Sequence, residues 1–200
     1  NDMAAYDLEE QETIDELKAW WKQYGKLVLL SAAAFVISVS GMQGWRYYAQ
    51  RQAEQAAEAY AALAKAVAGR DVKKIQDAAA VVLDRHAKTP YGPRAALIAA
   101  RSSLEAGDVA SAKLRLAWVL DHAPDPELQD ATRLRLAGVL LDEKKYNEAL
   151  KLVEVKHGEF FNALYLDLKG DIFAIQGKAA EARGAYQSAL QQMDRNSPYR

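Results

Sequence analysis

The chain has 200 residues, of which 50% are hydrophobic and 26% are charged, a balance that fits a folded chain rather than a disordered or fibrous one. Its formal net charge of −1 excludes the broad cationic field of a general nucleic-acid binder. The absence of cysteine excludes disulfides, thiolate-held zinc, iron–sulfur clusters and a cysteine nucleophile. Only 11 glycines and 5 prolines interrupt the chain, so the composition favours helix nearly throughout.

Residues 1–26 form an acidic segment with seven carboxylate side chains. Residues 6–24 predict a short amphipathic helix, capped by Asp7 and with Ile14, Leu17, Trp21 and Tyr24 on one face. Two interpretations remain open. The segment is either an interfacial helix lying on a membrane leaflet, or a solvated and partly frayed tail that its acidic residues keep away from anionic lipid.

Residues 27–45 predict a membrane-spanning helix. The stretch LVLLSAAAFVISVSGM at 27–42 has no charged side chain, and residues 43–45 extend it to nineteen, close to the roughly 20 residues that cross a bilayer. The expected anchor residues are Leu27, Val36, Trp45 and Arg46, the last two being of types that prefer the headgroup region. A buried helix of a soluble protein would be apolar on one face only, whereas this stretch is apolar all round. A cleaved signal peptide would begin with a short basic region, whereas the 26 residues before this stretch carry seven carboxylate side chains.

The charges beside this span indicate its orientation. Lys18, Lys22 and Lys26 precede it within fifteen residues, against Arg46 and Arg51 after it. Because the side with more lysine and arginine stays in the cytoplasm, we expect a cytoplasmic N-terminus and a domain of residues 46–200 outside the cytoplasm.

Residues 46–200 contain a repeated helix–turn–helix pattern. A small residue opens the expected second helix of each unit at Ala78, Ala112, Ala149 and Ala182, which are 34, 37 and 33 residues apart. Turns are expected at 69–71, 107–108, 144–145 and 177–178. No helix-breaking residue lies within 45–68, so the membrane helix is expected to continue into the first unit.

Small residues also recur midway along the first helices, at Ala100, Ala137 and Gly170, where two antiparallel helices would approach most closely. Each helix pair leaves an apolar face open until its neighbour stacks on it. The fold prediction is therefore all-α, with a single N-terminal transmembrane helix followed by a solenoid of about four helix pairs. The spacing resembles that of the tetratricopeptide repeat.

The three histidines are the only candidates for metal chemistry. His86, His122 and His157 recur near the ends of the second helices, where an imidazole interacts favourably with the helix dipole. Stacked repeats would hold them apart rather than gather them with an acid around a metal ion. With no Ser–His–Asp spacing or glycine-rich phosphate loop either, we predict no catalytic site, no metal and no cofactor.

The concave face of the solenoid is the candidate surface for partners, and the first helix of each pair would line it. In the tetratricopeptide register, that face carries leucine beside arginine and aspartate, a mixture that suits a peptide with an apolar anchor. The alternative is that the leucines are buried between helices. The candidate residues are Arg94, Leu97, Arg101, Leu104, Leu134, Gly138, Leu141, Leu164, Asp167, Asp171 and Ile175.

The order of these features resembles the YfgM family, ancillary subunits of the bacterial Sec translocon. The resemblance includes GWRYY at 44–48, TPYG at 89–92, RLRLAGVLL at 133–141, DLKGD at 167–171 and GKAAEARGAY at 177–186. It implies an inner-membrane anchor, a cytoplasmic N-terminus, a periplasmic repeat domain, and association with the SecYEG channel and the periplasmic chaperone PpiD. The chain ends at Arg200, soon after the last predicted helix, and we expect a capping helix to be missing or supplied by a partner.

From these features we expect a non-enzymatic adaptor that is tethered in the lipid bilayer and assists newly exported proteins at the translocon, with no nucleic-acid partner. One rival is a scaffold of another envelope assembly complex, which would share the fold and differ in its partners. A second is a regulator that acts through the acidic N-terminal tail.

Overall fold

A computed structural model describes residues 2–195, and it places side chains from residue 13 to residue 193. Every regular element in this range is a helix, as the sequence predicts. The chain divides into two compact units, residues 1–52 and 53–200. The helix α1 (Asp2–Ala68) belongs to both, because no break interrupts it before Gly69.

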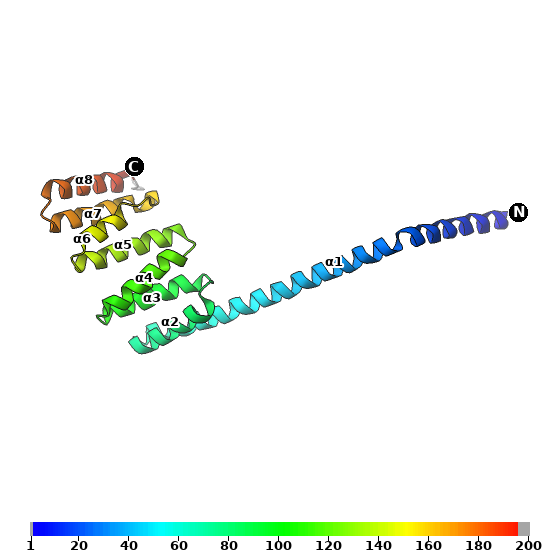
Figure 1. The fold of residues 1–200 in the computed structure, drawn as a ribbon, viewed down its shortest axis with the longest axis horizontal. Helices are drawn as coiled ribbons and strands as arrows, with labels where there is room; N and C mark the ends of the chain where they lie inside the picture. The colour runs from blue at the N-terminus through cyan, green and yellow to red at the C-terminus, as the bar shows by residue number, and fades with distance from the viewer. Residues whose placement is uncertain (1, 196–200) are drawn as a thin grey trace. The chain divides into compact units, whose positions relative to one another are not determined.

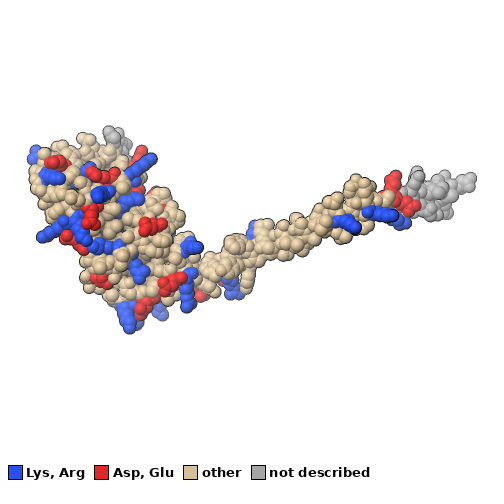
Figure 2. Space-filling model, viewed as in Figure 1, with Lys and Arg blue, Asp and Glu red and all other residues tan. Residues whose placement is uncertain are grey.

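In the first unit, α1 continues through Lys26 into the apolar stretch, so the amphipathic segment and the apolar stretch form one helix. The helix begins at Asp2 rather than at the predicted cap Asp7, whose side chain lies outside the described ones. Leu27, Val36 and Trp45 are exposed on it. By length and composition α1 is long and apolar enough to cross a membrane, and Figure 2 shows its uncharged stretch between charged residues.

In its described residues, the second unit contains four stacked helix pairs, as predicted (Figure 1). The first pair joins the end of α1 to α2 (Val72–His86). The others are α3 (Tyr91–Glu105) with α4 (Val109–His122), α5 (Pro126–Asp142) with α6 (Tyr146–Val153), and α7 (Asn162–Ile175) with α8 (Ala179–Arg195). A short 3-10 helix, η1 (Glu159–Phe161), precedes α7.

All four predicted turns are present, each with one residue in the left-handed backbone region. These residues are Arg70, Gly107, Lys144 and Gly177, with φ of 54°, 81°, 61° and 75°. In the last three turns, the following amide N–H reaches back to a carbonyl of the preceding helix at 2.8–2.9 Å. This bond satisfies a carbonyl that the helix end would leave without a partner.

The turns correct the repeat register of the first unit. Counted from the left-handed residue, Ala112, Ala149 and Ala182 all lie five positions on, and Ile75 holds that position in α2. The predicted Ala78 is therefore three residues too late. Asp71 and Asp108 confirm the alignment, because both cap their helices by accepting a hydrogen bond from the backbone N–H three residues on.

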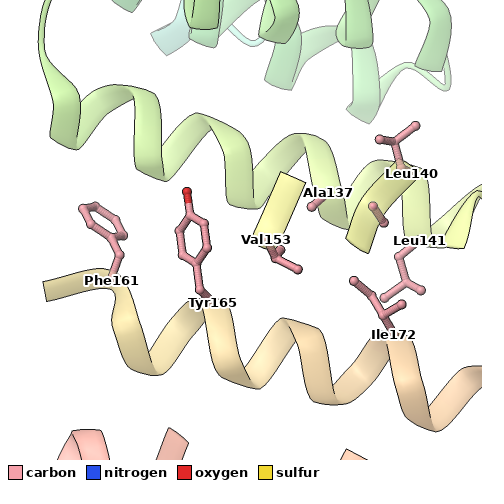
Figure 3. Packing of buried hydrophobic residues seen from close by; sticks show 8 residues of the cluster. Ala137, Leu140, Leu141, Val153, Phe161, Tyr165 and Ile172 are labelled. Atoms are coloured by element: carbon pink, nitrogen blue, oxygen red, sulfur yellow. The ribbon is translucent and has the colours of Figure 1, made fainter. Parts of the chain in front are cut away.

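Small buried residues make the close approach between paired helices possible. Ala100 and Ala137 are almost fully buried, as predicted. At Gly170, a Cβ atom would lie 2.5 Å from the Tyr186 ring, so only glycine lets α8 approach α7 this closely. The largest core cluster lies among α5, α6 and α7 and includes Ala137, Leu140, Leu141, Val153, Phe161, Tyr165 and Ile172 (Figure 3).

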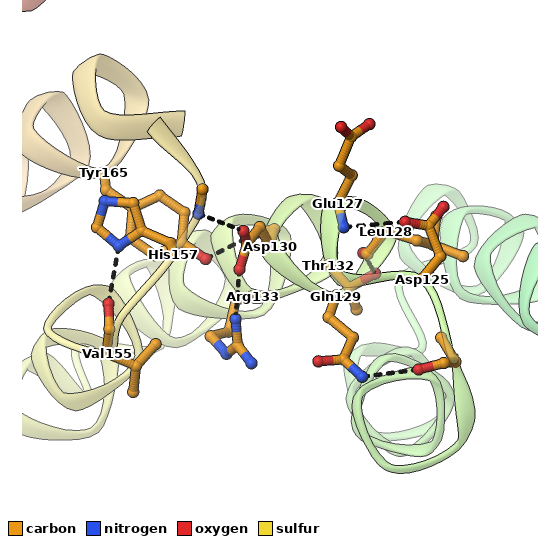
Figure 4. A network of polar contacts seen from close by, with 12 residues as sticks. Asp125, Glu127, Leu128, Gln129, Asp130, Thr132, Arg133, Val155, His157 and Tyr165 are labelled. Carbon is orange, nitrogen blue, oxygen red and sulfur yellow. Dashed lines mark hydrogen bonds and ion pairs between the residues drawn. The ribbon is translucent and has the colours of Figure 1, made fainter. Parts of the chain in front are cut away.

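The helix α6 ends at Val153, earlier than the predicted break at Gly158. The following loop is held by the buried Asp130 of α5 (Figure 4). Its Oδ2 accepts a hydrogen bond from the Gly158 N–H at 2.8 Å, and its Oδ1 pairs with Arg133 at 2.7 Å. The Tyr165 hydroxyl donates to the Asp130 carbonyl at 3.0 Å, and His157 stacks on the Tyr165 ring.

Candidate functional site

The helices α3 and α5 enclose a hollow of about 440 Å³ on the face that the first helices of the pairs line. Leucine and alanine form its apolar part, and charged side chains stand among them. Its lining residues are Leu97, Ala100, Arg101 and Leu104 from α3, Leu116 from α4, and Arg135, Gly138, Val139 and Asp142 from α5. The structure thus brings together Leu97, Arg101, Leu104 and Gly138 of the predicted surface.

A second hollow of about 440 Å³ lies one repeat earlier, between the end of α1 and α3. Four residues of α3 line this second hollow, and each stands 37 residues before a residue of α5 that lines the first hollow. They are Ile98, Arg101, Ser102 and Glu105. Val67 of α1 stands 37 residues before Leu104 in the same way. Arg101 of α3 lines both hollows, and we refer to the two hollows together as the groove.

Leu134 and Leu141 do not line this groove. Leu141 is buried in the core cluster, and Leu134 is half-buried and packs against the same cluster, which includes Ile172 of α7 (Figure 3). The reason is the length of α6, which has 8 residues where α2 and α4 have 15 and 14. A shorter second helix lets α5 contact α7 directly, and these leucines fill the junction. The alternative interpretation, in which leucines of this face are buried between helices, therefore holds for Leu134 and Leu141.

The remaining predicted residues lie outside both hollows. Arg94, Leu164, Asp167 and Ile175 are exposed on α3 and α7. Asp171 is half-buried, and its Oδ1 accepts a hydrogen bond from the Tyr186 hydroxyl at 2.7 Å. This bond to the carboxylate raises the pKa of Tyr186 to about 12, because the phenolic proton is held between the two oxygens.

Sequence reasoning missed Arg135, Val139 and Asp142 as groove residues. The prediction assigned a single face of each first helix to the partner surface. In the structure, one side of α3 faces the first helix of the preceding pair and another side faces the first helix of the next pair. The 37-residue spacing carried the signal, since these three residues repeat the positions of Ile98, Ser102 and Glu105.

Charged side chains at the groove are accessible to water. Arg101 pairs with Glu105 at 2.8 Å, and both side chains are more than 60% exposed. Such an exposed pair contributes little to stability, about 0.3–0.5 kcal/mol for a helical pair four residues apart. Arg101 is therefore free to exchange Glu105 for a carboxylate of a bound segment at small cost.

The histidines occupy separate sites. His122 stacks on Trp118, and its Nδ1 lies 2.8 Å from the Trp118 carbonyl oxygen. His157 belongs to the loop beside Tyr165, and His86 is buried at the end of α2. Over the described part of the chain, no group of three or more histidine, aspartate or glutamate side chains is arranged to hold a metal ion.

The stacked pairs and their groove define a helical-repeat protein of the tetratricopeptide kind. A family described as a tetratricopeptide repeat-like domain matches residues 18–200.

Comparison with relatives of known name shows to which family of helical-repeat proteins the chain belongs. The chain is 34% identical to the ancillary SecYEG translocon subunit of Haemophilus influenzae over 190 residues, which cover 94% of this chain and 91% of that protein. It is also 34% identical to the subunit of the same name from Neisseria gonorrhoeae, over 98% of this chain and 93% of the relative. The Escherichia coli subunit is 28% identical, over 90% and 87%. The chain belongs to the family of ancillary SecYEG translocon subunits, as the resemblance in its sequence predicts.

Proposed function

We propose that this protein is a non-enzymatic subunit of the Sec translocon, anchored in the inner membrane, whose repeat groove holds a polypeptide segment. Residues 1–26 would lie in the cytoplasm, 27–45 would span the membrane, and 46–200 would form the periplasmic repeat domain. The name of the relatives supports association with SecYEG, and the long apolar helix supports the anchor. The lysine excess before the span supports the orientation.

The observation that carries the binding proposal is the hollow between α3 and α5. Leu104 keeps 38% of its surface exposed there, beside the apolar Leu97 and Val139. Arg101, Arg135 and Asp142 stand around this apolar floor. Together they suit a segment that inserts one apolar side chain and places charged neighbours at the rim.

The occupants we propose are the periplasmic chaperone PpiD and chains emerging from the channel. The family resemblance of the sequence supports both. An anchor beside the channel exit would keep the groove at a high effective concentration near each emerging chain, so that weak binding suffices. This protein would then assist exported proteins by retaining them briefly rather than by chemistry.

Gly138 offers a direct test of the groove. A Cβ atom at Gly138 would meet no atom within 4 Å, and Gly138 lines the hollow, so we expect a larger side chain there to project into the hollow. We expect Gly138→Phe to reduce co-purification of PpiD and of arrested export intermediates at least tenfold, while SecYEG still co-purifies through the anchor.

Gly184→Phe is the matched control, because Gly184 of α8 is equally open and lies outside the groove. Full retention of PpiD and export intermediates by Gly138→Phe, with the helical content of the parent chain, would contradict the proposed groove.

A further inference from the structure

Just before the apolar stretch of α1, lysines follow one face of the helix, and Trp20 and Tyr24 lie on the opposite face. Lys18, Lys22 and Lys26 follow each other at intervals of four residues, so they share one face of the helix, and all three are exposed. Trp20, Tyr24 and Leu17 lie on the other side of the helix, whereas Trp21 and Ile14 lie beside Lys18, three and four residues from it. This separation places a cationic stripe at the edge of the apolar stretch that begins at Leu27.

The aromatic side forms one compact patch. The rings of Trp20 and Tyr24 are 5.8 Å apart, and those of Trp20 and Trp21 are 6.3 Å apart. Trp21 also covers Gly25, which is buried beneath its indole. Rings of this kind settle at the level of lipid headgroups, and they would hold the lysine stripe at the same depth.

Two of the three lysines are available for a ligand. Lys18 pairs with Asp15 at 3.3 Å, whereas the ion pairs of the described side chains include neither Lys22 nor Lys26. At the other end of the apolar stretch, the Arg51 guanidinium lies 5.3 Å from the centre of the Tyr47 ring, and its Nε donates to the Tyr47 hydroxyl. Arg51 is therefore already engaged with an aromatic ring, whereas Arg46, like Lys22 and Lys26, appears in none of the ion pairs of the described side chains.

The acidic residues nearby do not cancel this stripe. The run at positions 7–12 ends ten residues before Lys22, about 15 Å along the helix, which exceeds the screening length of about 8–10 Å at physiological salt. Asp15 is already paired with Lys18. Glu16 lies six residues before Lys22, off the lysine face.

We propose that Lys22 and Lys26, positioned by the Trp20–Trp21–Tyr24 patch, form a binding site for the phosphate of an anionic phospholipid headgroup. This inference rests on the proposed function only in requiring that α1 spans the membrane. An ammonium near an anionic lipid surface gains about 1 kcal/mol, which is about fivefold in affinity. The site would make the N-terminal end of the anchor select anionic over zwitterionic lipid.

Quenching of tryptophan fluorescence by brominated lipid tests the site in the full chain. Trp45→Phe and Trp118→Phe leave Trp20 and Trp21 as reporters in phosphatidylcholine vesicles that contain either brominated phosphatidylglycerol or brominated phosphatidylcholine at equal mole fraction. We expect association of the anionic lipid to be stronger by about fivefold for each ammonium, which is about 25-fold for Lys22 and Lys26 together. The preference for the anionic lipid should disappear in Lys22→Gln/Lys26→Gln and persist in Lys22→Arg/Lys26→Arg. It should also persist in Arg46→Gln/Arg51→Gln, which changes the cations at the other end of the apolar stretch.

Equal quenching by both brominated lipids would overturn the lipid site while leaving the membrane span intact. A preference that survives in Lys22→Gln/Lys26→Gln would also overturn it. Quenching by neither lipid would show that α1 is not inserted, which would contradict the proposed anchor as well.

Discussion

Backbone conformation at single turn residues sets part of the stability of the repeats. Lys144 adopts a φ of 61° where the equivalent residues Gly107 and Gly177 are glycines, and a side chain in this region costs about 1–2 kcal/mol. The sequence therefore carries a strained residue at two of its four turns, Arg70 before α2 and Lys144 between α5 and α6.

Replacing this lysine by glycine should stabilise the domain. We expect Lys144→Gly to raise the free energy of unfolding by about 1 kcal/mol, because glycine adopts the left-handed conformation without steric strain. Denaturant unfolding followed by circular dichroism measures the change. Lys144→Ala removes the same side chain but keeps a Cβ atom, and should change stability little. A gain as large in the alanine variant would contradict the role assigned to backbone strain.

A second residue-scale prediction concerns pH. The bond to Asp171 raises the pKa of Tyr186 to about 12, whereas an unfolded tyrosine ionises near 10. Its contribution is present in full below pH 10 and is lost as pH rises toward 12, since the unfolded chain releases the phenolic proton first. Unfolding measurements at pH 9, 10.5 and 11.5 should show a shallower loss of stability in Tyr186→Phe than in the parent chain. Equal slopes would contradict this assignment.

At the scale of elements, the short α6 and the loop after it distinguish the third pair from the others. The loop is held by the buried Asp130, which contacts Arg133 and the Gly158 N–H together. Without it, the Gly158 N–H and the Arg133 guanidinium lose their carboxylate partner in a site with little water.

Removing that carboxylate should loosen the whole third pair. We expect Asp130→Ala to destabilise the domain by about 3 kcal/mol, the cost of breaking a buried charged pair. Hydrogen exchange should show faster exchange of the Gly158 amide and of the residues after it. Asp121→Ala, at an exposed position of α4, is the control and should change stability by less than about 0.5 kcal/mol. A loss below about 1 kcal/mol in Asp130→Ala would contradict the account of this network.

Sequence periodicity could predict the helix pairs and their turns, because apolar spacing and turn chemistry are local properties. It placed the turn before α4 at 107–108 and the small buried residues Ala100, Ala137 and Gly170. It could not predict which leucines of the first helices would be buried, because that depends on the distance between non-adjacent helices. Leu104 remains accessible and Leu141 is buried, although both lie at equivalent positions 37 residues apart.

At the scale of the whole molecule, each unit suits one part of the proposed role. The first unit holds an exposed apolar helix with the composition of a membrane span, and the second holds a groove with an apolar floor and a charged rim. Membership of the family of ancillary SecYEG translocon subunits supports a role associated with the Sec translocon.

The most direct measurement is site-specific photocrosslinking in intact membranes, with a probe at Leu104 in the groove and a second probe at Val36 in the anchor. Leu190, exposed on α8 outside the groove, serves as the control position. We predict that Leu104 crosslinks to PpiD or to newly exported chains, that Val36 crosslinks to translocon subunits, and that Leu190 captures neither to the same extent. Cytoplasmic partners at Leu104, or equal capture at Leu104 and Leu190, would contradict the proposed topology or the proposed groove, respectively.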